Sequence, residues 1–208
     1  MTQFDSLIFD MDGTLWDAVD SYVAVWDATF AEFGMPTGTV TREQLIECMG
    51  MPINEIYRSL VGDPSGADRF LKRLAENEDR LMISLGGTLY PGVKEQIPRL
   101  ASRYRLFMLS NCSALGLPNF LAYTGLGEHF TDTISYGVNL QQKDHNIRLL
   151  MQRHNLTAPL YIGDTEGDCR SAHSAGIPMQ LARYGFGDAP DAEFSADSFG
   201  QLAQMLLE

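Results

Sequence analysis

Residues 7–15 read Leu7-Ile8-Phe9-Asp10-Met11-Asp12-Gly13-Thr14-Leu15, and the interpretation of the whole chain begins from this stretch. Three consecutive apolar residues without polar alternation are typical of a short parallel strand that is buried on both faces. Two carboxylates, Asp10 and Asp12, follow it, and Gly13 permits a sharp turn after them. The stretch therefore predicts a central strand that ends in a pair of acidic side chains.

Two later stretches have the same pattern. The apolar residues 106–109 precede Ser110 and Asn111, and the apolar residues 160–162 precede Gly163 and Asp164. Further elements are expected at residues 94–103, 141–154, 168–175 and 197–207, which have helical spacing, and at residues 177–181, which read as a strand. Alternating strands and helices predict an α/β fold with a doubly wound, Rossmann-like parallel sheet.

Residues 16–88 interrupt this alternation. An apolar stripe at helical spacing occupies residues 19–33, Thr41–Gln44 fits a capping box, and residues 54–61 and 68–83 read as two more helices. No strand is expected in this segment. We predict that residues 1–15 and 89–208 form an α/β catalytic core and that residues 16–88 form a small all-helical cap domain, inserted after the first strand with hinges at 14–17 and 86–88.

The composition limits the class of partner. The 208 residues are 45% hydrophobic and 20% charged, as in an ordinary globular protein. A net charge of −12 argues against binding to nucleic acid or to an anionic membrane, because both require a basic face. The three cysteines form no C-x-x-C pair, and neither a signal peptide nor a membrane span is recognised. We therefore expect a cytoplasmic protein that is a monomer or a small homo-oligomer.

The polar strand ends predict one shared site, because ligands of open α/β sheets bind at the carboxyl ends of the strands. The side chains brought together there are expected to be Asp10, Asp12, Ser110, Asn111, Asp164 and Asp168. Four carboxylates in one crevice repel each other unless a cation lies among them, and ligands that are all oxygens favour Mg²⁺. A magnesium ion beside hydroxyl and amide groups indicates a phosphate site. Two carboxylates suit a division into a nucleophile and an acid–base group.

The same residues resemble the motifs of the haloacid dehalogenase superfamily, in particular its phosphoglycolate-phosphatase-like and β-phosphoglucomutase-like branch. The four motifs correspond, in the family's order, to residues 10–15, Ser110-Asn111, Lys143 and residues 163–168. Residues 16–88 stand where the family carries a small mobile cap. One departure concerns Lys143, which many relatives follow with Pro-Asp-Pro, whereas Asp144-His145-Asn146 follow it here. Lys94 and Arg105 are the poorer alternatives by position.

The resemblance implies a Mg²⁺-dependent phosphatase that forms an aspartyl-phosphate. Asp10 is then the nucleophile, and Asp12 protonates the leaving group and later deprotonates the attacking water. The implied metal ligands are the Asp10 carboxylate, the Asp12 backbone carbonyl and the Asp164 carboxylate, with Asp168 as a further or outer ligand; the implied phosphate-binding groups are Ser110, the Asn111 backbone and Lys143.

Met49, Gly50 and Met51 resemble the cap loop that reaches over the active site in this family, although a core-packing role for the two methionines is an equal alternative. The apolar neighbours of the loop favour a small organic phosphate over a highly charged one. A phosphomutase or a pyrophosphatase is the alternative enzyme, and a non-catalytic binding module is the alternative from another class. The lack of a dense Arg/Lys cluster near the loop favours the phosphatase over the mutase. The intact Asp12 and fourth motif argue against the binding module.

Overall fold

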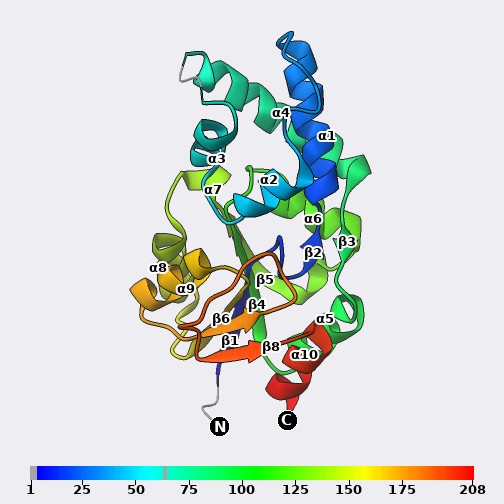
Figure 1. Ribbon diagram of the computed structural model, residues 1–208. Helices are drawn as coiled ribbons and strands as arrows, with labels where there is room; N and C mark the ends of the chain where they lie inside the picture. Colours follow the sequence, from blue (N-terminus) through cyan, green and yellow to red (C-terminus); the bar gives the residue numbers. More distant parts are fainter. Residues whose placement is uncertain (1–3, 63–64) are drawn as a thin grey trace.

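A computed structural model describes residues 4–62 and 65–208, and its centre is a six-stranded sheet (Figure 1). The strands lie in the order β5-β4-β1-β6-β7-β8, and every neighbouring pair is parallel. Their bounds are β1 Ser6–Phe9, β4 Arg105–Ser110, β5 Phe130–Ser135, β6 Pro159–Gly163, β7 Met179–Ala182 and β8 Phe194–Ala196. The three strands on which the sequence argument depends, β1, β4 and β6, are adjacent at the centre of the sheet. The predicted α/β fold is therefore confirmed.

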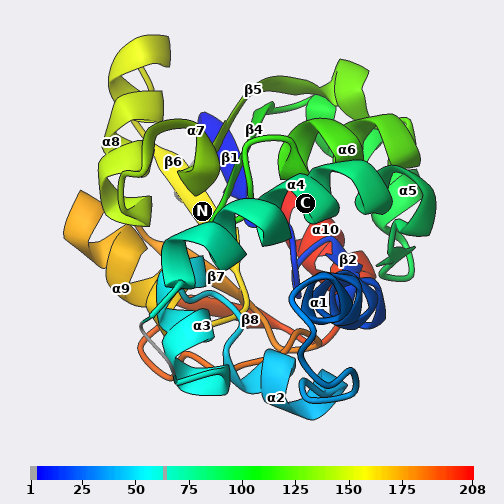
Figure 2. The same ribbon diagram turned by 90° about the horizontal axis from the view of Figure 1, so that it is seen from above.

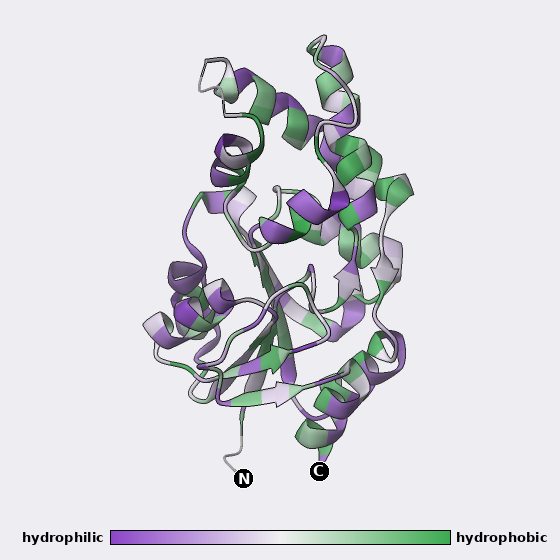
Figure 3. Ribbon diagram, in the orientation of Figure 1, coloured by the Kyte–Doolittle hydropathy of each residue, from purple (hydrophilic) through white to green (hydrophobic). Residues whose placement is uncertain are grey.

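Helices cover both faces of the sheet, as a doubly wound fold requires (Figure 2). Around the sheet lie α5 Val93–Ala101, α6 Gly116–Thr124, the short α7 Tyr136–Asn139, α8 Lys143–His154, α9 Glu166–Ala175 and α10 Phe199–Leu207, with the 3₁₀ helix η1 Gly127–His129. Leu7 and Phe9 of β1 belong to the core cluster that includes α5, α6 and α10, whereas Ile8 belongs to the cluster with α8 and α9. Figure 3 shows the hydrophobic colours concentrated along the central strands.

The edge strands β5 and β8 and the helix α6 were not predicted from the sequence. β5 reads Phe-Thr-Asp-Thr-Ile-Ser, so its apolar residues are isolated between polar ones, and β8 has only three residues. Edge strands are less buried than central ones, so they lack the continuous apolar run by which the central strands were recognised. The strand expected at 177–181 is β7, shifted to Met179–Ala182.

Four helices from residues 19–85 stand at one end of the sheet (Figure 1). They are α1 Val19–Glu32, α2 Arg42–Glu47, α3 Ile53–Leu60 and α4 Ala67–Leu85. The predicted capping box of α2 is present, since the Gln44 backbone N–H donates to Thr41 Oγ1 and the Thr41 backbone N–H donates to Gln44 Oε1. Phe70 of α4 packs against Trp26 and Phe30 of α1 with ring centroids 5.7 and 5.3 Å away. Aromatic packing therefore holds the longest two of these helices together.

The expectation that residues 16–88 contain no strand is wrong at the two ends of the segment. The strand β2 (Trp16–Asp17) pairs antiparallel with β3 (Thr88–Leu89), with Trp16 opposite Leu89 and Asp17 opposite Thr88. The chain segments that enter and leave residues 16–88 lie side by side and run in opposite directions, so their backbones can form hydrogen bonds with each other. Two-residue strands carry no periodicity that a sequence could reveal. The division into a core and a cap at residues 16–88 stays a prediction.

No helix within the described ranges 4–62 and 65–208 has both the length and the apolar character needed to cross a membrane.

The beginning of the central strand is fastened to the loop before β6 by Asp5. Its Oδ2 accepts hydrogen bonds from the Thr157 backbone N–H, the Thr157 hydroxyl and the Ala158 backbone N–H at 2.6, 2.9 and 3.1 Å. Burial alone raises the pKa of Asp5, but these bonds and one from the Ser6 hydroxyl outweigh it and lower that pKa to about 2. The ionised carboxylate therefore stabilises the folded chain.

We expect Asp5→Ala to lower the free energy of unfolding at neutral pH by about 1–3 kcal/mol, because it removes charge-assisted hydrogen bonds. The pKa of Asp5 is depressed from 3.8 to about 2 in the folded state, so the wild type's advantage is complete above pH 3.8 and fades as the pH falls toward 2. Urea denaturation of both proteins between about pH 2 and pH 7 measures this difference in the free energy of unfolding. Replacement of the exposed Asp191 by Ala is the control, and an advantage that does not vary with pH would contradict the role of the charge.

Candidate active site

Asp10 lies directly beyond β1, where its backbone N–H still donates to the carbonyl of Ile162 on β6 at 2.8 Å. This bond fixes the carboxylate at the carboxyl end of the sheet. Lys143, the first residue of α8, reaches the same place from another element. Its buried ammonium donates to Asp10 Oδ2 at 3.0 Å and to Asp168 Oδ1 at 2.6 Å. Despite its unusual following residues, Lys143 therefore lies beside the first and fourth motifs.

Asp10, Asp164 and Asp168 form a cluster of buried carboxylates suited to a cation. Each offers an oxygen, and these oxygens lie within 4.8 Å of one another. Asp164 Oδ2 accepts a hydrogen bond from the Phe186 backbone N–H at 2.8 Å, but its buried Oδ1 has no partner in the part of the chain that the structure describes. Burial and the two neighbouring carboxylates raise the pKa of Asp164 well above its usual range. An unpaired oxygen among three carboxylates fits a hard divalent ion such as Mg²⁺.

Gly13 is required here for space as well as for the turn. Its φ of +76° is in the left-handed region, and a Cβ on it would lie 2.0 Å from Asp164 Oδ2. Any side chain at this position would therefore displace a carboxylate of the cluster.

Asp168 is held by more contacts than its neighbours. Its Oδ2 accepts hydrogen bonds from the Thr165 backbone N–H at 3.0 Å and the Thr165 hydroxyl at 2.7 Å, and the Tyr161 hydroxyl lies 3.2 Å from Oδ1. Burial raises the pKa of Asp168, but Lys143 and these donors outweigh it and lower that pKa. Thr165 and Tyr161 were not predicted as site residues. The spacing of Thr165 and Asp168, which form the capping box of α9, was the available signal for the first of them.

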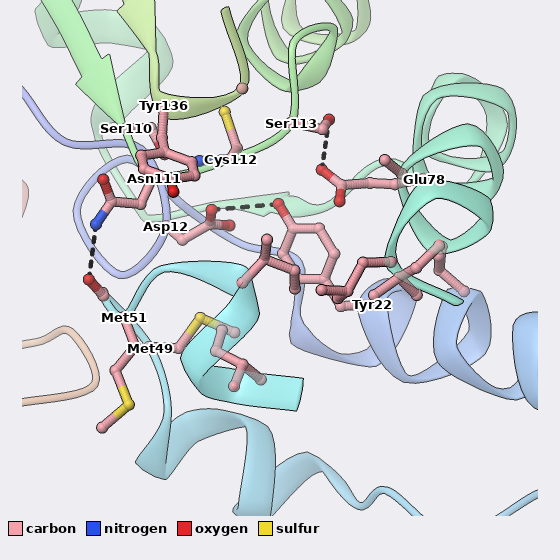
Figure 4. A pocket seen from close by; sticks show the side chains of 18 of the residues that line it. Asp12, Tyr22, Met49, Met51, Glu78, Ser110, Asn111, Cys112, Ser113 and Tyr136 are labelled. Carbon is pink, nitrogen blue, oxygen red and sulfur yellow. Dashed lines mark hydrogen bonds between the residues drawn. The ribbon is translucent and has the colours of Figure 1, made fainter. Parts of the chain in front are cut away.

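The side chain of Asp12 lies outside this cluster of carboxylates. The predicted metal ligand of Asp12 is its backbone carbonyl, and that role stays a prediction. Its two carboxylate oxygens accept hydrogen bonds from Trp16 Nε1 at 2.9 Å and from the Tyr22 hydroxyl at 3.2 Å. Figure 4 shows the bond from Tyr22. Burial, followed by the negative charges of Asp10 and Glu78, raises the pKa of Asp12 to about 8. The same turn thus carries one carboxylate beside a lysine and another that favours its protonated form at neutral pH. Trp16 and Tyr22 were not predicted as site residues.

The loop of residues 48–52 lies beside Asn111 and Thr165, and its role as a cap loop stays a prediction. The side-chain amide of Asn111 donates to the carbonyl of Gly50 at 2.8 Å (Figure 4). Gly50 has a φ of +83°, and a Cβ on it would lie 3.1 Å from the Thr165 hydroxyl. Met49 packs partly buried against the main core cluster, whereas Met51 is 41% exposed. Ser110 is buried at the end of β4 and accepts a hydrogen bond from the Cys112 backbone N–H at 3.3 Å.

This loop separates two cavities. The first, which we call the inner chamber, has a volume of about 320 Å³ and extends from Asp10, Asp12, Ser110 and Lys143 up to helices α1–α4. The second, the outer cavity, has a volume of about 660 Å³ and lies between the loop and α9. Lys143 and Asn111 line both cavities, but Asp10, Asp12 and Ser110 line the inner chamber alone.

Comparison with known proteins agrees with this arrangement. The model of the haloacid dehalogenase-like hydrolase family matches residues 7–182. Among curated proteins, a phosphoglycolate phosphatase of Vibrio vulnificus is 27% identical and covers 97% of this chain and 95% of its own length. One of Synechococcus elongatus is also 27% identical and covers 88% and 85%.

Solved structures share the fold at lower identity. A haloacid dehalogenase-like hydrolase from Streptococcus pneumoniae has a TM-score of 0.87 at 21% identity, covering 99% of this chain and 100% of its own. A predicted phosphoglycolate phosphatase from Haemophilus somnus has a TM-score of 0.85 at 20% identity, covering 99% of each chain. The resemblance noted in the sequence is confirmed at the level of family and fold.

We expect Mg²⁺ to raise the melting temperature of the wild type by roughly 5 °C at saturating concentration, because the ion binds only the folded chain. Asp164→Asn should lose this increase, since it removes the carboxylate whose Oδ1 is unpaired. Without Mg²⁺ the variant should melt no lower than the wild type, because a neutral amide replaces a buried carboxyl group whose ionised form is unfavourable. Differential scanning fluorimetry measures both effects.

Asp191→Asn, at an exposed position, is the matched control and should keep the full response to Mg²⁺. An equal response in Asp164→Asn would place the ion elsewhere.

Proposed function

This chain belongs to the haloacid dehalogenase-like hydrolase family, and we propose that it is a Mg²⁺-dependent phosphatase that hydrolyses small phosphomonoesters through an aspartyl-phosphate on Asp10. The observation that carries the proposal is the contrast between two carboxylates of one turn. Asp10 lies beside the ammonium of Lys143, whereas Asp12 is bonded to Trp16 and Tyr22 and has a pKa of about 8. Such a pair suits a nucleophile and a proton donor.

In the first half of the reaction, a carboxylate oxygen of Asp10 attacks phosphorus, and the bond between phosphorus and the ester oxygen breaks. Asp12 gives its proton to the departing oxygen, so that an alcohol leaves. Burial of Asp12 favours the protonated form that this step requires. Trp16 and Tyr22 hold the Asp12 side chain in place for the transfer.

In the second half, the ionised Asp12 takes a proton from a water molecule whose oxygen attacks the phosphorus of the aspartyl-phosphate. The bond from phosphorus to the Asp10 oxygen breaks, inorganic phosphate leaves, and Asp12 is protonated again for the next cycle. Each proton given up by Asp12 is thus recovered, and both carboxylates return to their initial state.

The phosphoryl oxygens are assigned to Ser110, the Asn111 backbone and Lys143. Lys143 is the one cation that lines the inner chamber within residues 4–62 and 65–208. A magnesium ion held by Asp10, the Asp12 carbonyl and Asp164, with Asp168 beside them, would neutralise charge on the transferring phosphoryl group. Residues 16–88 are proposed as the cap that covers these groups and excludes bulk water.

The alternative functions find less support in the chamber. A phosphomutase must bind a second phosphate of its sugar substrate, and a pyrophosphatase must bind a second phosphoryl group. Within the described residues the chamber offers no cation for either beyond Lys143, which is already bonded to Asp10 and Asp168. A non-catalytic module has no need for a buried, protonated Asp12, whose environment is unfavourable to its charge.

We expect Asp10→Asn to abolish Mg²⁺-dependent phosphate release from a panel of small phosphate esters, because the amide cannot form the phosphoenzyme. Release is measured with and without Mg²⁺ for the wild type and the variant. Near-normal release by Asp10→Asn would overturn the proposed nucleophile, and no release from any ester by the wild type would overturn the proposed phosphatase.

We expect Asp12→Ala to lower the rate of phosphate release by on the order of 10²–10⁴, because proton transfer to the leaving oxygen is lost. The increase in melting temperature with Mg²⁺ should remain, since only the backbone of Asp12 is a proposed ligand. The loss should be smaller for p-nitrophenyl phosphate than for an alkyl phosphate, because nitrophenolate leaves without protonation. Equal losses for the two esters would argue against an acid role.

A further inference from the structure

We propose that the inner chamber selects phosphomonoesters whose leaving group has an apolar body and no negative charge, and that Glu78 is the residue that disfavours carboxylated leaving groups. This inference rests on the proposed phosphatase function and goes beyond it by naming the substrate class.

The position of Asp12 decides which cavity receives the leaving group. A proton donor must lie within hydrogen-bonding reach of the departing oxygen. Asp12 lines the inner chamber and not the outer cavity, and so do Asp10 and Ser110. The group attached to that oxygen therefore extends into the inner chamber, toward helices α1–α4.

The upper wall of the chamber is apolar. All four helices from residues 19–85 contribute to it, through Val25 and Trp26 of α1, Leu45 of α2, Ile53 and Ile56 of α3, and Leu74 of α4. Trp26, Leu45 and Leu74 are almost completely buried in the core cluster. Transfer of an apolar leaving group from water to this wall is favourable, whereas a charged group would lose its hydration there.

The charged groups of the chamber that lie away from the phosphate position are acids. Glu78 and Asp79 of α4 line the chamber, and the Ser113 hydroxyl donates to Glu78 Oε1 at 2.8 Å (Figure 4). Burial raises the pKa of Glu78 to about 7, so that about half of it is ionised at pH 7 and most of it above about pH 8. Glu78 and Asp12 line the same chamber.

The cations of the surrounding helices do not compensate for these acids. Arg42 is paired with Asp17, Arg73 with Glu32, and Arg80 donates to Asn77 Oδ1 at 2.9 Å. None of these three lines the chamber, and neither do the other cations of the four helices, Arg58, Arg69 and Lys72. In the outer cavity, Arg170 is paired with Glu166 at 2.9 Å and is 67% exposed. A carboxylate on the leaving group would therefore meet like charges without a counter-ion, which is a repulsive arrangement in a partly desolvated site.

The acidic lining of the chamber disfavours the substrate for which several relatives are named. Phosphoglycolate carries a carboxylate one carbon away from its ester oxygen, so that this group would enter the chamber near Asp12 and Glu78. We therefore expect phosphoglycolate to be a poor substrate of this enzyme, although several relatives are named for it.

The first experiment compares three esters of similar size that differ in the charge of the leaving group: propyl phosphate (neutral), phosphoethanolamine (cationic) and 2-phosphoglycolate (anionic). We expect kcat/KM of the wild type with Mg²⁺ to be at least about tenfold higher for propyl phosphate than for 2-phosphoglycolate. Equal or better use of 2-phosphoglycolate would overturn the inference and leave the phosphatase function intact. A higher kcat/KM for phosphoethanolamine than for propyl phosphate would overturn the apolar preference. It would indicate that the acids of the chamber bind a cationic leaving group instead. Hydrolysis of none of the three would overturn the inference about the leaving group, whereas the phosphatase function is decided by the wider panel of phosphate esters.

The second experiment tests Glu78 by comparing kcat/KM for two esters in the same variant. A change in the acidity of Asp12 affects both esters, so it cancels in the ratio of the two values. Glu78→Gln keeps the size of the side chain and removes its charge. At about pH 8, where a carboxyl with a pKa of about 7 is mostly ionised, it should lower the ratio of kcat/KM for propyl phosphate to that for 2-phosphoglycolate by about tenfold. Near pH 7 the change should be only about twofold, because about half of Glu78 is already neutral. Glu76→Gln, on the exposed side of the same helix, is the matched control and should leave the ratio unchanged. An unchanged ratio in Glu78→Gln would contradict the proposal that Glu78 disfavours carboxylated leaving groups.

A variant at another position keeps the inference falsifiable if Glu78→Gln fails to fold. Met51 lines the chamber and is 41% exposed, so Met51→Arg can introduce a cation without opening the core. The added charge should shift the same ratio toward 2-phosphoglycolate. A shift in the opposite direction, or none, would contradict an exclusion based on charge.

Discussion

The site depends on the buried ammonium of Lys143, which bonds to Asp10 and Asp168 at once. These two acids come from the ends of different elements, 158 positions apart along the chain, and each is unfavourable to bury as a lone charge. One cation between them offsets part of that cost and fixes the distance between β1 and α9. Because Lys143 begins α8, the position of that helix is fixed by the same contact. The remaining negative charge of the cluster is what favours a divalent ion.

The sequence was informative where burial is complete. β1, β4 and β6 are recognisable because both faces are covered and their apolar residues are consecutive, and the polar residues at their ends follow from the topology of a parallel sheet. Lys143 could be proposed by resemblance alone, since a lysine in the first turn of a helix is normally solvated. The structure buries it because α8 begins beside the strand ends.

The features that the sequence could not reveal depend on contacts between distant segments. The pairing of β2 with β3 joins residues more than 70 positions apart, and two residues are too few for a periodic pattern. Tyr22 lies in an apolar stripe that reads as core, yet its hydroxyl meets Asp12. Glu78 reads as one acid of a charged helix, and only the packing of α4 over the site turns it toward the chamber. Hydrophobic patterning identifies which face of a helix is buried, but it does not identify which cavity a polar residue on that face will line.

The chain's two tryptophans occupy informative positions. The indole N–H of Trp16 donates to Asp12, and Trp26 forms part of the apolar wall. Both tryptophans therefore lie at the candidate site, Trp16 beside Asp12 and Trp26 in the apolar wall of the inner chamber. Tryptophan emission from this protein is in effect an internal optical signal of what the chamber contains, available without any attached dye.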